Sequence, residues 1–174
     1  IGRLTEQKNT LFIIDIFNAL VKKEPKAKLL IIGDGNLREA MLAKIDEYGI
    51  KDHVLYLGRR EDIPQFYNAM DCFLLPSLYE GLPVVGVEAE NCGLPMFFST
   101  EIPEESSACK DLGVFMSLEK TPDEWAEAVL KAVKKNMPIR MGKTESVKAA
   151  GFDSSVEASK LLEYYEELID LQQT

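Results

Sequence analysis

The sequence predicts an α/β fold in which a mostly parallel sheet carries helices on both faces. Short apolar runs alternate along the chain with longer amphipathic segments, as in strand–helix–strand units. Glycines and charged residues gather directly after these runs, at Gly33, Gly35, Gly58, Glu80 and Gly81. Ligands bind at the carboxyl ends of the strands in open α/β sheets. The pattern therefore predicts a Rossmann-like domain with one binding rim, to which loops from distant parts of the chain contribute.

Five apolar runs are short enough to be buried strands. They cover residues 28–32, 53–57, 72–75, 96–99 and 114–116. The amphipathic segments predict helices at Thr10–Lys23 and at about residues 36–48, 63–69, 83–92, 122–135, 140–150 and 155–171. Residues 104–111 are consistent with either a helix or a loop.

Several residues mark the ends of these helices. Pro83 is expected to open a helix, where its missing N–H costs nothing, and Gly93 is expected at the left-handed position that ends it. Asp62 is expected to cap the helix that follows it. Residues 121–124 and 154–157 each match a capping box, in which a hydroxyl and a glutamate satisfy the first free N–H groups of a helix.

The composition fits a globular protein and argues against several classes. The 174 residues are 46% hydrophobic and 28% charged, which fits one domain, residues 1–174, with a sizeable core. A formal net charge of -9 argues against nucleic acid as a partner. Three cysteines without metal-ligand spacing are typical of a reduced cytoplasmic protein. No apolar run is long enough to be a transmembrane segment.

The stretch from Pro76 to Pro95 has features that folding alone does not explain. A buried strand leads into a loop that carries Glu80, and the helix that follows carries Glu88. The N-terminus of a helix attracts anions, and carboxylates accept hydrogen bonds from hydroxyl groups. Together these features predict a ligand with both phosphates and hydroxyls, namely a nucleotide sugar.

Basic residues are expected at the same rim. Arg3 and Lys8 lie on the first rim loop, and Arg59 and Arg60 follow the second strand. Each of them taken singly is more often a solvated surface charge. Four basic residues at one rim of an acidic protein nevertheless predict a site for a diphosphate, which arginine binds with a planar fork and lysine as a point charge.

Other readings of these motifs are weaker. The turn Gly33–Gly35 resembles half of a phosphate-binding loop, although Arg38 stands where a third glycine would be. Glu80 and Glu88 could be an acid/base pair like that of glycoside hydrolases, but the helix N-terminus between them is better suited to phosphate. No Ser-His-Asp set, histidine cluster or D-x-D metal motif is present.

The sequence resembles the C-terminal, donor-binding domain of GT-B glycosyltransferases. It is most similar to the family-4 retaining enzymes of bacterial capsular polysaccharide and exopolysaccharide synthesis. The resemblance lies in the runs GRL-x-x-QKN, LLIIGDG, VLYLGRR and AMDCFLLPSLYEGLPVVGVEAENCGLP, and it covers about residues 1–99 well. Its most specific part is the E-x7-E spacing of Glu80 and Glu88.

The resemblance implies catalytic roles for three residues. Arg3 and Lys8 would bind the donor diphosphate and stabilise it as it leaves, and Glu80 would contact ring hydroxyls of the transferred sugar. The implied reaction is transfer of the sugar to an acceptor hydroxyl with retention at the anomeric carbon. The resemblance implies no cofactor and no metal, because basic residues take the place of the metal, and it implies a UDP- or GDP-linked donor.

The resemblance also implies a set of donor-binding residues. Glu88 would contact the ribose hydroxyls, Arg59 would lie near the base, and the amides of Gly81 and Leu82 would lie near the phosphates or the sugar. The expected set is Gly33, Gly35, Arg59, Gly81, Leu82 and Glu88.

The resemblance further implies that parts of a longer enzyme are absent from this chain. GT-B enzymes have two similar domains, and the N-terminal, acceptor-binding domain is not in this sequence. The strand that precedes Gly2 in the family is also absent, which predicts a gap at the centre of the sheet. The last helix is expected to be displaced. We expect the isolated chain to hold donor with little or no turnover, and the full-length enzyme to be cytoplasmic, at the inner face of the membrane.

Two other classes stay open at this point. A nucleotide-sugar epimerase shares the GT-B plan but needs acid and base residues that the sequence does not supply. A non-catalytic α/β module of flavodoxin-like shape predicts no affinity for nucleotide sugars and tolerance of substitutions at Glu80 and Glu88. Loss of nucleotide affinity in a folded Glu88→Ala variant would separate the glycosyltransferase from such a module.

Overall fold

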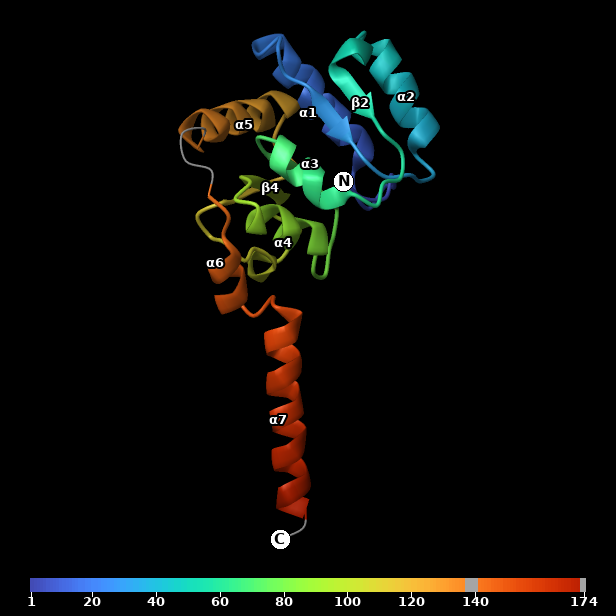
Figure 1. Ribbon diagram of the computed structural model, residues 1–174. Coiled ribbons are helices and arrows are strands. Elements are labelled where there is room, and N and C mark those ends of the chain that lie inside the picture. Colours follow the sequence, from blue (N-terminus) through green and yellow to red (C-terminus); the bar gives the residue numbers. More distant parts are fainter. Residues whose placement is uncertain (137–140, 173–174) are drawn as a thin grey trace.

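The structure is a computed structural model that describes residues 1–136 and 141–172 (Figure 1). It consists of an α/β body and a long C-terminal helix, α7 (Ser154–Gln172), which projects away from that body. No helix in the described residues has both the length and the apolar character that crossing a bilayer requires.

Five strands form two parallel sheets. β1 (Leu29–Ile31) pairs with β2 (Val54–Tyr56), and a second sheet has the order β3 (Phe73–Leu75), β4 (Met96–Ser99), β5 (Gly113–Met116). Each predicted strand is confirmed to within one residue at either end, and the parallel arrangement is confirmed as well.

The strands fall into two groups that are not joined to one another. A cavity of about 810 Å³ lies between β1 and β3 and is lined by both strands, with apolar side chains such as Leu30, Ile32 and Leu74. No strand in the described residues joins β1 to β3, so their facing edges have no ladder partner. The division agrees with the gap that the resemblance implied.

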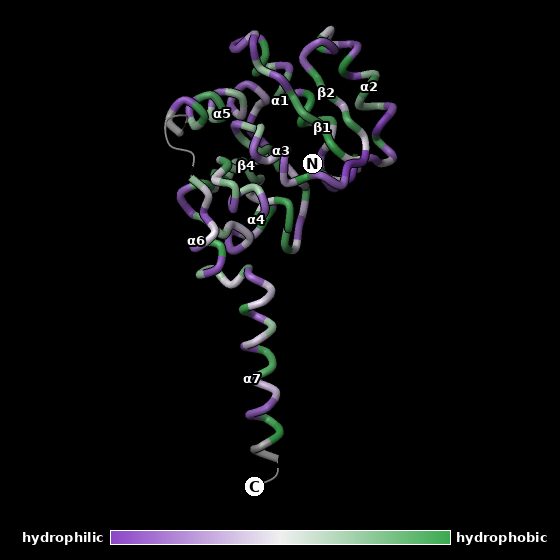
Figure 2. The backbone as a smooth tube through the Cα atoms, in the orientation of Figure 1, coloured by the Kyte–Doolittle hydropathy of each residue, from purple (hydrophilic) through white to green (hydrophobic). Residues whose placement is uncertain are grey.

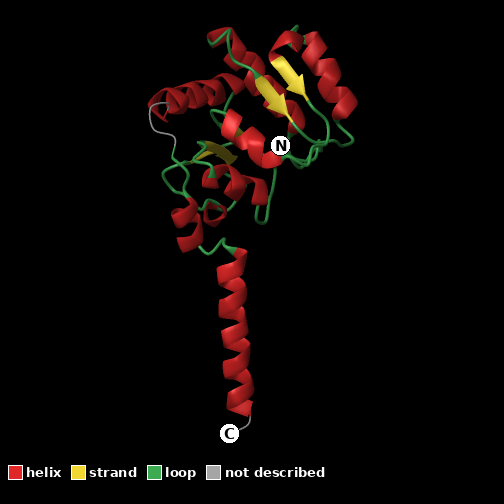
Figure 3. Cartoon of the chain, in the orientation of Figure 1, coloured by secondary structure: helices red, strands yellow, loops and turns green. Residues whose placement is uncertain are grey.

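The helices surround the strands (Figure 3). They are α1 (Thr10–Lys23), α2 (Arg38–Glu47), α3 (Ile63–Ala69), α4 (Val84–Asn91), α5 (Pro122–Asn136), α6 (Thr144–Ala149) and α7, with short 3-10 turns at Lys51–His53 and Glu104–Ser106. The bounds of α1 and α3 are those predicted, and the other helices are confirmed with shifted ends. α6 begins later than predicted, and the predicted start at residue 140 lies outside the described residues.

Two adjacent residues of β4 show that helices cover both faces of its sheet. Phe97 belongs to the core formed with α1, α2 and α5, whereas Phe98 belongs to the core formed with α3 and α4. Successive side chains of a strand point to opposite faces, so these two cores lie on opposite faces. The first core contains Trp125 of α5, which is fully buried and meets the ring of Phe12 edge-on.

Some helix ends follow the sequence prediction and others do not. The capping box at the start of α5 is confirmed, since Thr121 N–H donates to Glu124 Oε2 at 2.8 Å. Asp62 does not cap α3 with its side chain; both its oxygens accept hydrogen bonds from Arg60 instead. Pro83 lies at the N-cap position of α4, one residue before the predicted place.

The predicted capping box at the start of α7 is also wrong. The Asp153 carboxylate accepts hydrogen bonds from the N–H groups of Ser155 and Val156, at 3.0 and 3.2 Å. Asp153 therefore takes the N-cap position that the sequence assigned to Ser154. A carboxylate one residue earlier reaches the first free N–H groups of the helix and also carries the charge that a helix N-terminus favours.

Candidate functional site

Loops from distant parts of the chain meet at the carboxyl ends of the strands, as the sequence predicted. Gly2 N–H donates to Ile32 O at 2.9 Å, beyond the end of β1. Gly33 N–H in turn donates to Gly58 O at 2.8 Å, beyond the end of β2. These bonds join the segment that carries Arg3 to the turns after the first two strands.

Gly33 and Gly35 are required by the close approach of the segment at residues 2–4. A Cβ on Gly33 would lie 1.8 Å from the Gly2 carbonyl oxygen, and one on Gly35 would lie 2.2 Å from the Leu4 carbonyl oxygen. Gly33 also has a φ of +137°, which side chains rarely adopt. Both glycines therefore let the Arg3 segment close onto the turn, and their contacts with a donor stay predictions.

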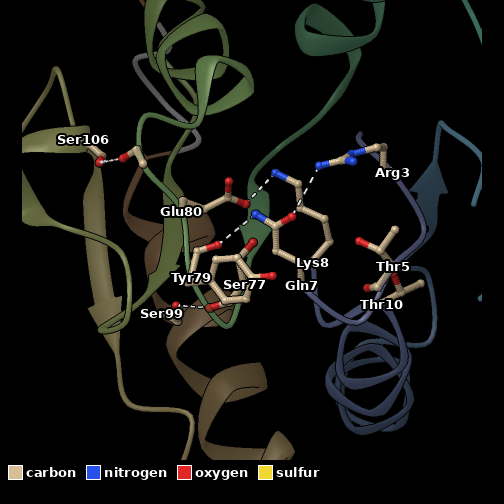
Figure 4. A network of polar contacts seen from close by, with 11 residues as sticks. Arg3, Thr5, Gln7, Lys8, Thr10, Ser77, Tyr79, Glu80, Ser99 and Ser106 are labelled. Atoms are coloured by element: carbon tan, nitrogen blue, oxygen red, sulfur yellow. Dashed lines mark hydrogen bonds and ion pairs between the residues drawn. The ribbon is translucent and has the colours of Figure 1, made fainter.

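An ion pair joins two of the predicted catalytic residues. Lys8 Nζ lies 2.5 Å from Glu80 Oε1, and the two side chains are only 16% and 8% exposed. Figure 4 shows them pointing toward one another from the loop before α1 and the loop after β3. The structure thus brings together two residues that are 72 positions apart in the sequence.

Gln7 connects Arg3, the third predicted catalytic residue, to the loop that carries Glu80. Its Oε1 accepts a hydrogen bond from Arg3 Nη2 at 3.3 Å, and its Nε2 donates to the carbonyl oxygen of Tyr79 at 3.2 Å (Figure 4). Leu78 N–H donates to the Gln7 carbonyl oxygen at 2.8 Å. Arg3, Lys8 and Glu80 therefore form one cluster, and Gln7 is the residue that links its parts.

Two serines hold the loop that carries Glu80. The buried Ser99 hydroxyl, at the end of β4, donates to Ser77 O at 2.5 Å, and the Ser106 hydroxyl donates to Gly81 O at 3.1 Å. With the Gln7 bond to Tyr79, three carbonyls of residues 77–81 are held by side chains from three other segments. Restraint of this kind keeps a binding loop in one conformation.

A buried carboxylate fixes the segment that supplies Ser106. Glu90 of α4 is fully buried and accepts hydrogen bonds from the Ser107 hydroxyl at 2.5 Å and from Ala108 N–H at 2.7 Å. Burial raises the pKa of the Glu90 carboxyl above its usual value, although these hydrogen bonds oppose the shift. Glu90 thus ties the turn Glu104–Ser106 to α4.

Glu88 has a different partner from Glu80. It lies on an exposed part of α4, and its Oε2 accepts a hydrogen bond from the hydroxyl of the buried Tyr67 on α3 at 2.7 Å. Burial and this carboxylate raise the pKa of the Tyr67 hydroxyl well above its usual value. The contact orients Glu88, whose predicted role at the ribose stays a prediction.

The two arginines after β2 differ in their partners. Arg60 forms a pair of hydrogen bonds with Asp62, at 2.9 and 2.7 Å, and its guanidinium lies over the ring of Phe66. Arg59 has a side chain that is 83% exposed and lies 3.9 Å from Asp34. Arg59 is therefore the one available to a ligand at this rim, while Arg60 holds the start of α3.

The loop between Glu80 and α4 is open to solvent. Gly81 and Leu82 are exposed, and nothing lies within 4 Å of a Cβ placed on Gly81. In the described part of the chain, the N-cap position of α4, Pro83, makes no side-chain cap hydrogen bond. An anion can therefore approach these amides, which agrees with their predicted place near the phosphates.

Two hydroxyl oxygens within this region are buried without a hydrogen-bond partner among the residues that the structure describes. They are Thr5 Oγ1 and Ser77 Oγ, in the two loops that meet at the Lys8–Glu80 pair (Figure 4). Buried polar atoms are rarely left unsatisfied in native proteins, and such atoms often mark functional sites.

Among the described residues, no three His, Cys, Asp or Glu side chains are grouped as a metal site requires.

Five residues that build the site have no role predicted from the sequence. These are Gln7, Tyr67, Glu90, Ser99 and Ser106. Gln7 lies within the run GRL-x-x-QKN that carries the resemblance, but no role was predicted for it. The other four act through one or two hydrogen bonds to segments far along the chain, so no local pattern distinguishes them from ordinary polar residues. Glu90 gave the best available signal, because a carboxylate in a short apolar helix next to a turn is expected to have a buried partner.

Comparison with known proteins agrees with the resemblance. A family model described as glycosyl transferases group 1 matches residues 1–149. A Bacillus subtilis protein described as a glycosyltransferase, EpsF, is 33% identical over 165 residues, which cover 95% of this chain and 43% of that protein. An Escherichia coli UDP-Gal:alpha-D-GlcNAc-diphosphoundecaprenol alpha-1,3-galactosyltransferase is 36% identical over 102 residues, which cover 57% of this chain and 26% of that enzyme.

The fold is likewise similar to that of solved glycosyltransferases. The crystal structure of Anabaena HepE in complex with UDP superimposes with a TM-score of 0.80 at 20% identity, over 96% of this chain and 47% of that one. The chain thus spans less than half the length of these relatives. Because the family model covers most of its residues, the chain belongs to the family of glycosyl transferases group 1.

Proposed function

We propose that the chain is the donor-binding part of a retaining glycosyltransferase. It binds a nucleoside-diphosphate sugar for transfer to an acceptor hydroxyl in bacterial polysaccharide synthesis. The observation that carries the proposal is the cluster of Arg3, Gln7, Lys8 and Glu80, in which cations and a carboxylate meet beside open helix amides. Cations suit the diphosphate, and a carboxylate suits sugar hydroxyls.

The charged groups of the cluster stabilise the charge that develops during the reaction. As the bond between the sugar and the diphosphate breaks, negative charge grows on the leaving phosphate. Arg3, Lys8 and the uncapped N-terminus of α4 stabilise that charge, and Glu80 holds the sugar by its hydroxyls. This assignment needs neither a metal ion nor a cofactor.

The known relatives favour UDP as the nucleotide. The Escherichia coli relative is named for a UDP-linked galactose donor, and HepE was solved with UDP. We place the acceptor site outside this chain, because the chain spans less than half of its relatives. Cysteines that form no disulfide in the described residues, at positions 72, 92 and 109, fit a cytoplasmic enzyme.

A calorimetric titration tests the proposal. The chain is titrated without metal against UDP, GDP and their sugars, and saturable binding of one nucleotide is expected. Lys8→Met should weaken that binding about tenfold, as expected for the loss of one charge-assisted contact. Lys22→Met, on the exposed surface of α1, is the matched control and should leave affinity unchanged. A folded chain that binds none of these ligands would contradict the proposal.

A further inference from the structure

We propose that Gln7 is a positioning residue that couples Arg3 to the loop that carries Glu80. Through its amide, it sets where the Arg3 guanidinium lies relative to Lys8 and to the donor diphosphate. This inference rests on the function proposed above, because it concerns the same site. It assigns a role to a residue that neither the charge pattern nor the carboxylate pair had singled out.

The Gln7 amide accepts one hydrogen bond at its oxygen and donates another from its nitrogen. Oε1 accepts from Arg3 Nη2 at 3.3 Å, while Nε2 donates to Tyr79 O at 3.2 Å. A guanidinium can only donate and a carbonyl oxygen can only accept, so one orientation of the amide satisfies both partners. The side chain of Gln7 is therefore locked between the two loops.

The main chain strengthens the connection. Leu78 N–H donates to Gln7 O at 2.8 Å, and the neighbouring pair of Lys8 and Glu80 lies 2.5 Å apart. Two consecutive residues of the first loop thus hold three consecutive residues of the second. The side-chain bond of Gln7 can be removed by substitution without removing the main-chain bond, so the two loops stay joined in a variant.

A neutral partner suits the role of Arg3. In the described parts of the chain, carboxylates pair with Lys8, Arg59 and Arg60 but none pairs with Arg3. The Gln7 amide orients the guanidinium without neutralising it, so its full charge stays available to a phosphate. An exposed arginine without such an anchor would sample many rotamers and lose part of its contact with the ligand.

The experiment is a double-mutant cycle of Gln7→Met and Arg3→Ala, with UDP and UMP as probes. Methionine keeps the length of the glutamine side chain and removes both hydrogen bonds. We expect Gln7→Met to weaken UDP binding about fivefold and UMP binding much less, because the anchored guanidinium acts on the diphosphate. In the Arg3→Ala background, Gln7→Met should have no further effect on UDP affinity.

The outcomes separate this inference from the proposed function. If the wild-type chain binds neither UDP nor UDP-sugars, the proposed function fails and the inference falls with it. If the wild type binds UDP but Gln7→Met weakens UDP and UMP equally, or adds to Arg3→Ala, then Gln7 only supports the fold and the inference alone is overturned. Urea unfolding of each variant confirms that the comparison is between folded proteins.

Discussion

The Lys8 ammonium contacts the Glu80 carboxylate, so a phosphate that binds Lys8 must compete with a negative charge already beside it. Both side chains are largely shielded from solvent, which makes their interaction stronger than that of a surface pair. The carboxylate therefore restrains the cation, and under the proposed function it would also contact the sugar hydroxyls. Under the proposed function, this arrangement would favour a ligand that offers phosphates and hydroxyls together over one that offers phosphates alone.

Removal of the Glu80 charge should therefore change ligand preference. We expect Glu80→Gln to bind UDP about fivefold more tightly, since Lys8 loses its competitor, and to gain much less for a UDP-sugar. Calorimetry with both ligands gives the ratio of the UDP affinity to the UDP-sugar affinity. Glu88→Gln is the control and should not tighten UDP binding, because Glu88 contacts the Tyr67 hydroxyl rather than a cation. Unchanged or weaker UDP binding by Glu80→Gln would contradict this.

Glu90 should make stability depend on pH. Its pKa is raised above the usual value of 4.5 by burial and by the negative charge of Asp111, while Ser107 and the Ala108 N–H lower it. The folded state then binds more protons than the unfolded state above about pH 4.5, so stability falls as pH rises through the raised pKa.

Substitution of Glu90 by glutamine isolates this effect. Glu90→Gln cannot ionise but can still accept from Ala108 N–H and donate to the Ser107 hydroxyl. We expect the free energy of unfolding of the wild type, relative to Glu90→Gln, to decrease as the pH rises from 4.5 toward neutrality. Urea unfolding at a series of pH values measures the difference. A relative stability that rises with pH would show that the carboxylate is stabilised in its charged form.

Among the elements, α7 depends most on its own sequence. It projects from the body (Figure 1), and hydrophobic residues alternate with hydrophilic ones along it (Figure 2). Several of these apolar side chains are exposed, namely Val156, Leu161, Leu162, Tyr164, Tyr165, Leu168 and Ile169. Tertiary packing gives most protein helices their stability. Helix propensity and the N-cap therefore matter more for α7 than for α1 or α5, which are packed in the core.

The N-cap of α7 provides a test. Asp153→Ala removes the acceptor for the N–H groups of Ser155 and Val156, and it should destabilise the helix by about 1 kcal/mol. Hydrogen exchange of the α7 amides measures the change. Ser154→Ala, at the position that the sequence predicted as the cap, should leave the exchange rates unchanged. Equal effects of the two substitutions would contradict the assignment of the cap to Asp153.

At the scale of the whole molecule, the site depends on how two halves of the chain meet. The segment that carries Arg3 is hydrogen-bonded to the turn after β1 in the first sheet, whereas the Glu80 loop and α4 follow β3 in the second. A cavity of about 810 Å³ lies between the strands of the two sheets. The contacts of Gln7 and Lys8 with Tyr79 and Glu80 bridge the halves at the rim.

Substitution of Gly33 tests how the Arg3 segment packs against the turn after β1. Gly33→Ala places a Cβ 1.8 Å from Gly2 O at a φ of +137°, so it should destabilise the protein by clearly more than about 1 kcal/mol. It should also weaken UDP binding, because the Arg3 segment must move. Gly81→Ala is the matched control, because a Cβ at Gly81 meets open space. It should lower the free energy of unfolding by less than about 0.5 kcal/mol. Urea unfolding compares them, and similar losses would contradict the packing role.

The sequence alone determined much of the fold. Short apolar runs located all the strands to within a residue, and the periodicity of residues 10–23 gave the bounds of α1. The capping box at Thr121 gave the start of α5. These features are predictable because each depends on residues a few positions apart, whose own conformations produce the pattern. The rim was predictable for a similar reason, since parallel strands must end on the same side.

Only the tertiary structure decided the contacts within the site. The pairing of Lys8 with Glu80, and of Gln7 with Tyr79, joins loops 72 residues apart, and no local pattern specifies which side chains meet. The choice of Asp153 over Ser154 as the cap of α7 also depended on competition between neighbouring acceptors. The sequence thus determined which chemical groups stand at the rim, and the packing of the two halves determined which of them touch.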